Sequence, residues 1–327
     1  MITPKYLLQN IDKFGNEPAL SIKDGNGEWR TYTWNDFYQY VLDISKSFLA
    51  YNIDINDKIC IYSYNRREWY ACYAAAQYVN SVAVGIYHTS SSTEVEWIVS
   101  NSNSKILFVG NNPNDNSERD KMPIHRLFSI IDKLDKIEYV VLMEGVEKIE
   151  HSKIITWENF ISKGSAINDS NVKERNESIK LEDTSSLIYT SGTTGNPKGV
   201  ELTYNNWKFE VSQTEYFLDI VQGDRYVSWL PLAHVFGQLV DNHVWIKNAI
   251  HMYVVDSPLS IVDFAKEVKP HIFIGVPRIY EKIYSNLKSA IESKTILKVG
   301  LKLPILSILL KKKLKDAVGF SNIRYAA

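Results

Sequence analysis

Residues 189–199, YTSGTTGNPKG, combine hydroxyl, glycine and lysine side chains in a pattern suited to binding a polyanion. Glycines let the backbone approach a ligand closely and adopt positive φ, and successive backbone N–H groups form a concave anion-binding site. The hydroxyls add donors, and Lys198 adds a cation. Short apolar runs at 186–189 and 200–203 predict a strand on each side of the loop. We therefore predict a strand, a loop and a second strand that together bind nucleotide phosphates.

Two other interpretations of this segment exist. A Walker-type P-loop requires glycine directly before its lysine, followed by Ser or Thr and a helix. Here Pro197 precedes Lys198 and Gly199 follows it. Because Pro197 also lacks an N–H group and a strand pattern follows, the spacing excludes the Walker motif. A solvated surface loop rich in Ser, Thr and Gly is the remaining alternative.

Two further segments place polar residues where a strand is predicted to end and a helix to begin. One is residues 228–238, SWLPLAHVFGQ, in which His234 can donate a hydrogen bond to an acyl or phosphate oxygen. The other is residues 275–278, which end with Arg278. Ligands in open parallel sheets bind at such carboxyl ends of strands. His234 is equally well explained as a buried core residue, and Arg278 as an ion-pair partner of Glu281.

Bulk composition narrows the class of protein. The 327 residues are 45% hydrophobic, which is typical of a folded globular chain with one large or two ordinary domains. The 37 basic and 38 acidic residues nearly cancel, so charge gives no case for a nucleic-acid partner. Cys60 and Cys72 are too few for a disulfide framework, and Cys72 is expected to be a buried structural thiol in a reducing compartment. We find neither a signal-peptide pattern nor an apolar stretch of about 20 residues, the length that spans a bilayer.

Alternating strand and helix patterns predict the fold. Short runs rich in Val, Ile and Tyr alternate with amphipathic segments from residue 58 onward. This alternation indicates an α/β fold of stacked, mostly parallel βαβ sheets. We expect a first sheet subdomain over 1–180 and a second over 181–327, which carries the phosphate-binding loop and is incomplete at its C-terminus. The polar stretch 164–177 is expected to be a loop at their junction.

A stretch that is both basic and apolar covers residues 288–315. Leucines and isoleucines are interspersed there with lysines from Lys294 to Lys315. Such stretches can lie on anionic membrane surfaces, which would make the protein a peripheral membrane partner. A connecting helix with solvated lysines is the favoured alternative, because Pro304 interrupts the helical periodicity.

Taken together, these segments resemble the acyl-activating, adenylate-forming superfamily, which includes acyl-CoA synthetases and luciferases. Residues 189–199 resemble its phosphate-binding signature, 230–234 its second core motif, and 275–283 a segment of the long-chain fatty acyl-CoA synthetases. The segments most similar to the bubblegum type of these synthetases are 65–69, 83–87 and 234–238. The resemblance extends from about Asn10 to the C-terminus.

The resemblance implies a ligase reaction in two steps. A fatty-acid carboxylate attacks the α-phosphate of Mg²⁺-bound ATP to give acyl-adenylate and pyrophosphate, and the thiol of coenzyme A then attacks the acyl carbonyl. Lys198 and His234 would be the catalytic residues, and Thr190 would also lie near Mg²⁺. The nucleotide-binding residues would be Thr190, Ser191, Gly192, Thr193, Thr194, Gly195, Asn196, Pro197 and Lys198. The acyl channel would be lined by Gln238, Gly275, Val276 and Pro277.

The same resemblance implies parts that have no counterpart before Ala327. These are a magnesium-binding glutamate, a ribose-binding aspartate and a mobile C-terminal domain with its own lysine. We therefore expect the N-terminal part of a long-chain fatty acid–CoA ligase (AMP-forming), inactive in isolation. We expect it in the cytoplasm, with internal membranes such as the endoplasmic reticulum as a peripheral location. A non-catalytic fragment or nucleotide-binding remnant is the alternative.

Overall fold

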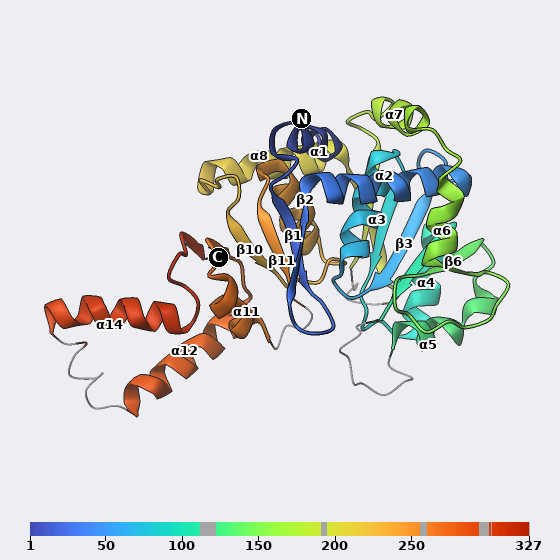
Figure 1. Cartoon of the computed structure of the whole chain (residues 1–327). Coiled ribbons are helices and arrows are strands. Elements are labelled where there is room, and N and C mark those ends of the chain that lie inside the picture. Colours follow the sequence, from blue (N-terminus) through green and yellow to red (C-terminus); the bar gives the residue numbers. More distant parts are fainter. Residues whose placement is uncertain (112–121, 191–194, 256–259, 294–300, 302, 327) are drawn as a thin grey trace.

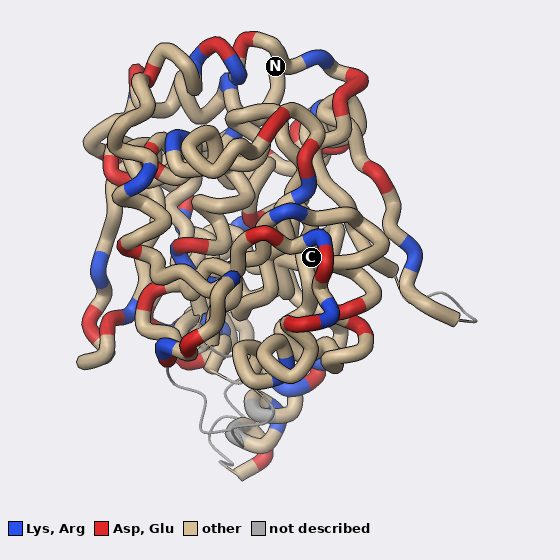
Figure 2. The backbone as a smooth tube through the Cα atoms, turned by 90° about the vertical axis from the view of Figure 1, so that its right-hand side faces the viewer, with Lys and Arg blue, Asp and Glu red and all other residues tan. Residues whose placement is uncertain are grey.

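A computed structural model of the chain describes residues 1–111, 122–190, 195–255, 260–293, 301 and 303–326 (Figure 1). Two sheets lie side by side, and helices cover their faces. Most neighbouring strands are parallel, so the predicted α/β class with mostly parallel sheets is confirmed. Basic and acidic residues are both scattered over the body of the molecule (Figure 2).

The first sheet contains seven strands in the order β7-β6-β5-β3-β4-β8-β9, all parallel except the pair β8–β9. Along β3, Ile59 and Ile61 belong to one hydrophobic core and Cys60 and Tyr62 to another, because successive side chains point to opposite faces. Burial on both faces explains why the central strands β5, β3 and β4 are mostly apolar, whereas the edge strand β9 is largely exposed. The strands are β3 (Lys58–Ser63), β4 (Val82–Ile86), β5 (Ile106–Gly110), β6 (Tyr139–Leu142), β7 (Ile154–Thr156), β8 (Thr184–Thr190) and β9 (Lys198–Thr203).

Different helices cover the two faces of this sheet. The core that continues into the second sheet contains Phe37 of α2, Tyr70 of α3 and Phe160 of α6, whereas the other core contains Val95 of α4 and Leu127 of α5. The helices are α2 (Trp34–Ala50), α3 (Arg67–Tyr78), α4 (Ser92–Ser102), α5 (Pro123–Phe128) and α6 (Trp157–Gly164), with a short 3-10 helix at Ile131–Lys133. Cys60 and Cys72 are fully buried, and burial raises the pKa of the Cys60 thiol to about 11, as expected for structural thiols.

The second sheet contains six strands in the order β13-β12-β10-β11-β1-β2. Its strands are β1 (Pro18–Lys23), β2 (Trp29–Thr33), β10 (Arg225–Ser228), β11 (His251–Val254), β12 (Ile272–Phe273) and β13 (Tyr325–Ala326). Its helices are α1 (Thr3–Phe14), α8 (Tyr204–Phe217), α9 (Val235–Gln238), a π-helical segment (Leu239–Val244), α10 (Trp245–Asn248), α11 (Ile261–Val268), α12 (Pro277–Glu292) and α14 (Pro304–Ala317). The helices α12 and α14 project from the body of the molecule (Figure 1).

The strands divide differently from the expected halves 1–180 and 181–327. The hairpin β1–β2 joins the second sheet, where Leu20 pairs with Met252. The hairpin β8–β9 completes the first sheet, where Leu187 pairs with Val84. Sequence order suggests contiguous halves because consecutive βαβ units usually pair. These two hairpins instead pair with segments far along the chain, and they interlock the two sheets.

The polar stretch 164–177 is not a loop, and that prediction was wrong. Its second part forms helix α7 (Asp169–Glu177). Val172 is buried, and Asn176 is buried with its Nδ2 donating to the carbonyl oxygen of Tyr78 at 3.2 Å. Two anchoring contacts on one face therefore hold a helix whose other residues are polar, so its sequence lacks a clear apolar period.

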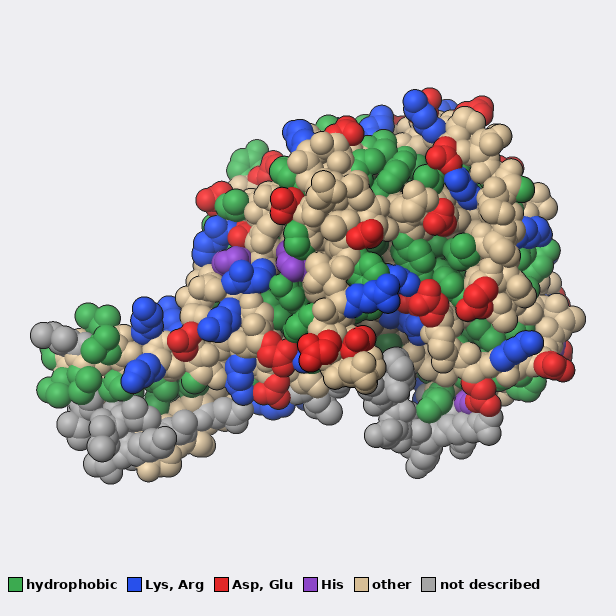
Figure 3. Space-filling view, in the orientation of Figure 1, with side chains coloured by type: hydrophobic (Ala, Val, Ile, Leu, Met, Phe, Trp, Pro, Cys, Tyr) green, Lys and Arg blue, Asp and Glu red, His purple; other side chains and the backbone are tan. Residues whose placement is uncertain are grey.

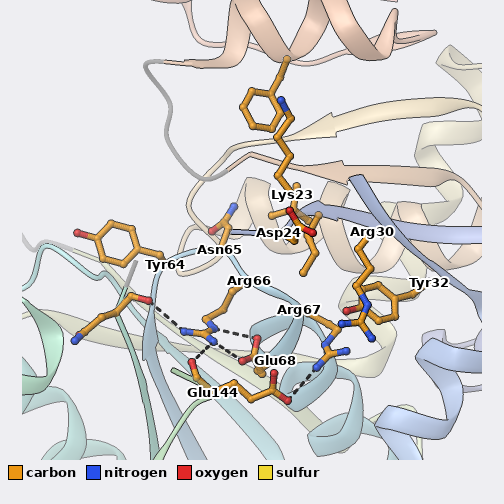
Figure 4. Close-up of a pocket in the computed structure, with 14 residues that line it drawn as sticks. Lys23, Asp24, Arg30, Tyr32, Tyr64, Asn65, Arg66, Arg67, Glu68 and Glu144 are labelled. Carbon is orange, nitrogen blue, oxygen red and sulfur yellow. Dashed lines mark hydrogen bonds and ion pairs between the residues drawn. The ribbon is translucent and has the colours of Figure 1, made fainter. Parts of the chain in front are cut away.

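A cavity of about 270 Å³ lies between the two sheets and is lined by charged residues (Figure 4). Arg66 donates through Nε to Glu68 at 2.9 Å and through Nη1 to the carbonyl oxygen of Asn111 at 3.1 Å. The guanidinium of Arg67 lies 4.7 Å from the ring centroid of Tyr32, which belongs to the second sheet. Arg66 therefore binds groups on the first-sheet side of the cavity, and the contact between Arg67 and Tyr32 crosses to the second sheet.

Replacing Arg66 by methionine tests the buried ion pair with Glu68. Glu68 is almost fully buried, so Arg66→Met leaves a buried carboxylate without its partner. We expect a loss of about 3 kcal/mol in the free energy of unfolding, measured by urea denaturation. The control is Lys173→Met, which breaks the exposed pair with Glu177 and should cost well under about 1 kcal/mol. Equal losses in both variants would contradict the role of the buried pair.

Candidate functional site

The predicted strand, loop and strand form the antiparallel hairpin β8–β9, in which Thr190 pairs with Lys198. Ser191, Gly192, Thr193 and Thr194 lie outside the described residues. Gly195 has φ of +102°, a left-handed conformation that favours glycine. The hairpin therefore has the conformational feature expected of a phosphate-binding loop at its described end.

Helix α4 holds this hairpin from outside the loop. The indole Nε1 of Trp97 donates to the carbonyl oxygen of Pro197 at 2.9 Å. The hydroxyl of Tyr189 donates to Oδ1 of Asn101 at 2.7 Å. A Cβ at Gly199 would lie 3.0 Å from the Tyr189 ring, so glycine lets the two strands fit around that ring. Helix α4 thus holds both sides of the hairpin, at Tyr189 and at Pro197.

One cavity of about 300 Å³ brings the loop and the second motif together. It lies at the carboxyl ends of β4 and β8, where ligands bind in parallel sheets. The lining residues are Gly85, Tyr87, Ser90, Glu94, Ile98, Ile188, Tyr189, Thr190, Pro197, His234 and Val235. Thr190, Pro197 and His234, which the sequence analysis selected separately, share this space. Lys198 is exposed beside Pro197, at the rim of the same hairpin.

His234 is exposed and precedes helix α9. Its Nδ1 accepts a hydrogen bond from the backbone N–H of Phe236 at 3.1 Å. In the neutral ring the proton therefore lies on Nε2, which makes that atom a hydrogen-bond donor. A donor in a lined cavity is what binding of a carboxylate or phosphate oxygen requires. This geometry favours the functional interpretation of His234 over a buried core residue.

The first sheet supports the turn that carries His234. The Nδ2 of Asn65, after β3, donates to the carbonyl oxygen of Leu230 at 2.8 Å. A Cβ at Gly85 in β4 would lie 2.9 Å from Cα of Ala233. The backbone of the turn thus packs directly on β4. Sequence analysis missed Asn65 and Gly85 as site-forming residues, because their importance depends on which sheet they face.

Gln238 lies behind Gly85 and is fully buried. Its Oε1 accepts a hydrogen bond from the Tyr73 hydroxyl at 3.2 Å, and its Nε2 is a buried donor with no partner among the described residues. The Tyr73 hydroxyl also lies 2.9 Å from Nε2 of His243, whose other ring nitrogen lies 2.6 Å from Oγ1 of Thr3. Burial lowers the pKa of His243 to about 3, so this ring is neutral. A polar network therefore orients Gln238 beside the cavity.

Gly275, Val276 and Pro277 lie at the junction of β12 and α12 and are not among the residues that line this cavity. A Cβ at Gly275 would lie 2.9 Å from the Tyr280 ring, which explains the glycine by packing. Arg278 is exposed, and no ion pair with Glu281 is seen in the described part of α12. The structure thus brings the phosphate loop and His234 together but does not join residues 275–277 to them.

Asp241 is a second buried polar group on the helix that follows His234. The Tyr226 hydroxyl donates to Oδ1 of Asp241 at 2.8 Å, and Ser228 donates to Oδ2. Burial raises the pKa of Asp241 from its usual 3.8 to about 7, against the lowering effect of these two hydrogen bonds. Asp241 therefore joins β10 to the π-helical segment as a largely neutral group below pH 7.

Comparison with known proteins agrees with this fold and site. The sequence matches the AMP-binding enzyme family over residues 7–315, and the chain belongs to this family. It is 29% identical over 292 residues to long-chain-fatty-acid–CoA ligase ACSBG2 of Homo sapiens, a match that covers 88% of this chain and 42% of that protein. It is 31% identical over 288 residues to the same enzyme of Gallus gallus, covering 85% and 36%. The chain thus spans about two fifths of the length of these bubblegum-type relatives.

Solved structures show the same architecture. A natural red-emitting luciferase from Phrixothrix hirtus superposes with a TM-score of 0.70 at 16% identity, covering 99% of this chain and 55% of the luciferase. The anthranilate–CoA ligase AuaEII, solved with anthranoyl-AMP, superposes with a TM-score of 0.70 at 16% identity, covering 100% and 54%. At this level of identity the likeness concerns the fold, and it shows that the two interlocked sheets are those of adenylate-forming enzymes.

Gly85→Ala tests the contact between β4 and the His234 turn. The added methyl group would lie 2.9 Å from Cα of Ala233 and 3.3 Å from Nε2 of Gln238, so the turn must shift. We expect a loss of about 1–3 kcal/mol in the free energy of unfolding and a changed NMR shift of the His234 ring. Gly25→Ala is the control, since no atom lies within 4 Å of its added Cβ. Similar urea midpoints for the two variants would argue against a tight contact.

Asp241→Asn tests the buried carboxyl through pH. The pKa of Asp241 is higher in the folded state than in the unfolded state. Its contribution to the free energy of unfolding is therefore fully present below the usual pKa of 3.8 and is lost as pH rises through about 7. We therefore expect the wild type to lose about 2 kcal/mol relative to Asp241→Asn between about pH 5 and about pH 8. Because the pKa of His243 is lowered in the folded state, its titration raises stability as pH rises. This effect occurs in both proteins and cancels in their difference. A constant difference across this range, measured by urea unfolding, would show that Asp241 titrates as an ordinary carboxyl.

Proposed function

We propose that this chain binds Mg²⁺-ATP through the hairpin β8–β9 and takes part in activating a long-chain fatty acid to acyl-adenylate and then acyl-CoA. The observation that carries the proposal is the single cavity lined by Thr190, Pro197 and His234. Adenylate formation needs phosphate-binding and carboxylate-binding groups at one point, since positioning supplies much of the catalysis. The substrate class follows from relatives named long-chain-fatty-acid–CoA ligases. The complete reaction is proposed for a protein of their length.

Lys198 and His234 would have complementary roles in the first step. A carboxylate oxygen forms a bond to the α-phosphorus while the bond from that phosphorus to pyrophosphate breaks. Lys198, exposed opposite Thr190 in the hairpin, would neutralise charge on the β- and γ-phosphates. The Nε2–H of His234 would donate to an oxygen of the carboxylate or the α-phosphate. Donors fixed in advance at developing charge stabilise such a transition state effectively.

Thr190 fits one contact to Mg²⁺. This ion prefers oxygen ligands and usually keeps waters and substrate phosphates in its shell with only one or two protein ligands. Thr190 offers a hydroxyl at the cavity, and the described residues contain no cluster of three acidic, His or Cys side chains. Nucleotide phosphates and water would supply further ligands, together with the magnesium-binding glutamate that the family resemblance implies. When bound, the ion would neutralise the phosphates.

Coenzyme A would be the second substrate, its thiol attacking the acyl carbonyl as AMP leaves.

A non-catalytic nucleotide-binding protein is the second candidate function. The hairpin β8–β9 supports this candidate as well, because nucleotide binding does not require turnover. Both candidates predict ATP binding at the hairpin, and they differ in turnover.

Lys198→Ala tests the proposal in the natural protein that contains this chain. We expect oleate-dependent pyrophosphate release to fall by about 100- to 1,000-fold in kcat/KM, because a charge that stabilises the transition state is removed. Lys173→Ala, on the exposed face of α7, is the control and should leave kcat/KM unchanged.

Two other outcomes would count against parts of the proposal. Unchanged pyrophosphate release in Lys198→Ala would overturn the role of the hairpin. If the unsubstituted protein binds ATP but releases no pyrophosphate with oleate, the non-catalytic candidate is correct. Nucleotide binding is measured separately by isothermal titration with Mg²⁺-ATP, so the two failures can be told apart.

A further inference from the structure

Helix α14 forms an arm with a fixed base. At its C-terminal end, the backbone N–H of Phe320 donates to the carbonyl oxygen of Lys315 at 2.7 Å, and Asp316 lies 3.8 Å from Lys269. Gly319 packs so closely on α11 that an added Cβ would lie 2.0 Å from the carbonyl oxygen of Ala265. The N-terminal end of α14 lies far from the body of the protein (Figure 1). The C-terminal end of α14 is therefore attached to the body of the protein through α11, and its N-terminal end is exposed to solvent.

The far end of α14 is apolar. The exposed fractions are 51% for Leu303, 38% for Leu306, 69% for Ile308 and 57% for Leu309. Large aliphatic side chains on one short segment rarely stay this exposed unless another surface covers them. In the space-filling view, hydrophobic side chains gather at the end of this arm (Figure 3).

The half of α14 nearer the body is basic. Lys311, Lys312, Lys313 and Lys315 are all exposed, and none has an ion-pair partner in the described part of the chain. The one acidic residue of this helix, Asp316, is paired with Lys269. Basic side chains lie between the apolar end and the body in Figure 3. The arm is therefore apolar at its end and positively charged behind it.

We propose that α14 docks the protein on an anionic lipid surface, with its apolar end in the acyl boundary and its lysines among the headgroups. Residues 303–310 extend about 12 Å as a helix, enough for the depth of about 5–10 Å that interfacial helices reach. Lysines near an anionic surface are attracted by its negative potential, at about fivefold in partitioning for each. The proposal does not depend on the ligase activity.

The positive charge of α14 favours an anionic lipid surface over other partners for its apolar end. A second exposed apolar group, Phe209, Tyr216 and Phe217 on α8, has one lysine on its own helix, Lys208, against Glu210 and Glu215, so α8 has no excess of basic residues. No helix in the described ranges is long and apolar enough to cross a membrane, which is consistent with docking on the surface.

Vesicle flotation tests the proposal with the intact chain. We expect binding to vesicles of phosphatidylcholine with phosphatidylserine, and at least 10-fold weaker binding to phosphatidylcholine alone. Ile308→Ser with Leu309→Ser should lower binding to the anionic vesicles at least 10-fold, as should Lys312→Glu with Lys313→Glu. The matched control is Tyr216→Ser with Phe217→Ser on α8, which should bind like the wild type. Binding should also weaken as salt is raised.

Several outcomes would overturn the proposal. Equal binding to both kinds of vesicle, or equal loss in the α8 control, would show that α14 is not a basic lipid-docking arm. Absence of vesicle binding together with a dimer that the Ile308→Ser, Leu309→Ser variant abolishes would assign the apolar end to a second copy. Circular dichroism of each variant separates loss of binding from loss of folding.

Discussion

The close approach of Gly85 in β4 to Ala233 in the turn after β10 is the contact on which the candidate site depends. Two sheets that share a core do not by themselves bring a loop of one against a turn of the other. Here a strand without a side chain lets the turn backbone pack directly on β4, and Asn65 holds the same turn through Leu230. Because of this contact, Thr190 and His234 line one cavity.

The polar groups behind this contact make the site stiff. Gln238, Tyr73 and His243 are buried and hydrogen-bonded, and the π-helical segment that follows α9 carries both His243 and Asp241. Buried hydrogen bonds are costly to break, so such a network specifies one arrangement of the helix. The hairpin is held in a different way, by single bonds from α4 to Pro197 and Tyr189. His234 thus lies on a turn that the first sheet supports, and it shares a cavity with a hairpin that α4 holds.

Family membership explains the core of the fold, whereas the arm at α14 is a separate surface feature. The AMP-binding fold explains the interlocked sheets and the cavity at the carboxyl ends of their strands. It does not require the exposed apolar end of α14 or the four lysines behind it. Under the proposed function the fatty-acid substrate would partition into lipid, and the proposed arm would bring the protein to the surface where that substrate resides.

The sequence alone predicted many of the strands and the motifs of the candidate site. Apolar runs bounded by turns predicted the strands from β3 to β6, since parallel strands buried on both faces are mostly apolar. Two short runs on either side of the glycine-rich loop predicted the antiparallel hairpin β8–β9, whose second strand is largely exposed. Glycine, hydroxyl and lysine spacing identified the phosphate-type loop, and the type and order of residues around His234 identified the second motif. Helix α7 was missed, because two anchors, Val172 and Asn176, hold an otherwise polar helix.

Local sequence determined the elements and the residues capable of chemistry, because secondary structure and side-chain type depend on near neighbours. The tertiary structure alone decided which sheet each hairpin joined, why Gly85 and Asn65 matter, and that residues 275–277 lie outside the cavity with His234. These depend on pairings between segments far apart in the chain, where packing and backbone hydrogen bonds outweigh local preference. The phosphate loop belongs to the first sheet and His234 to the second, and only their packing makes them one site.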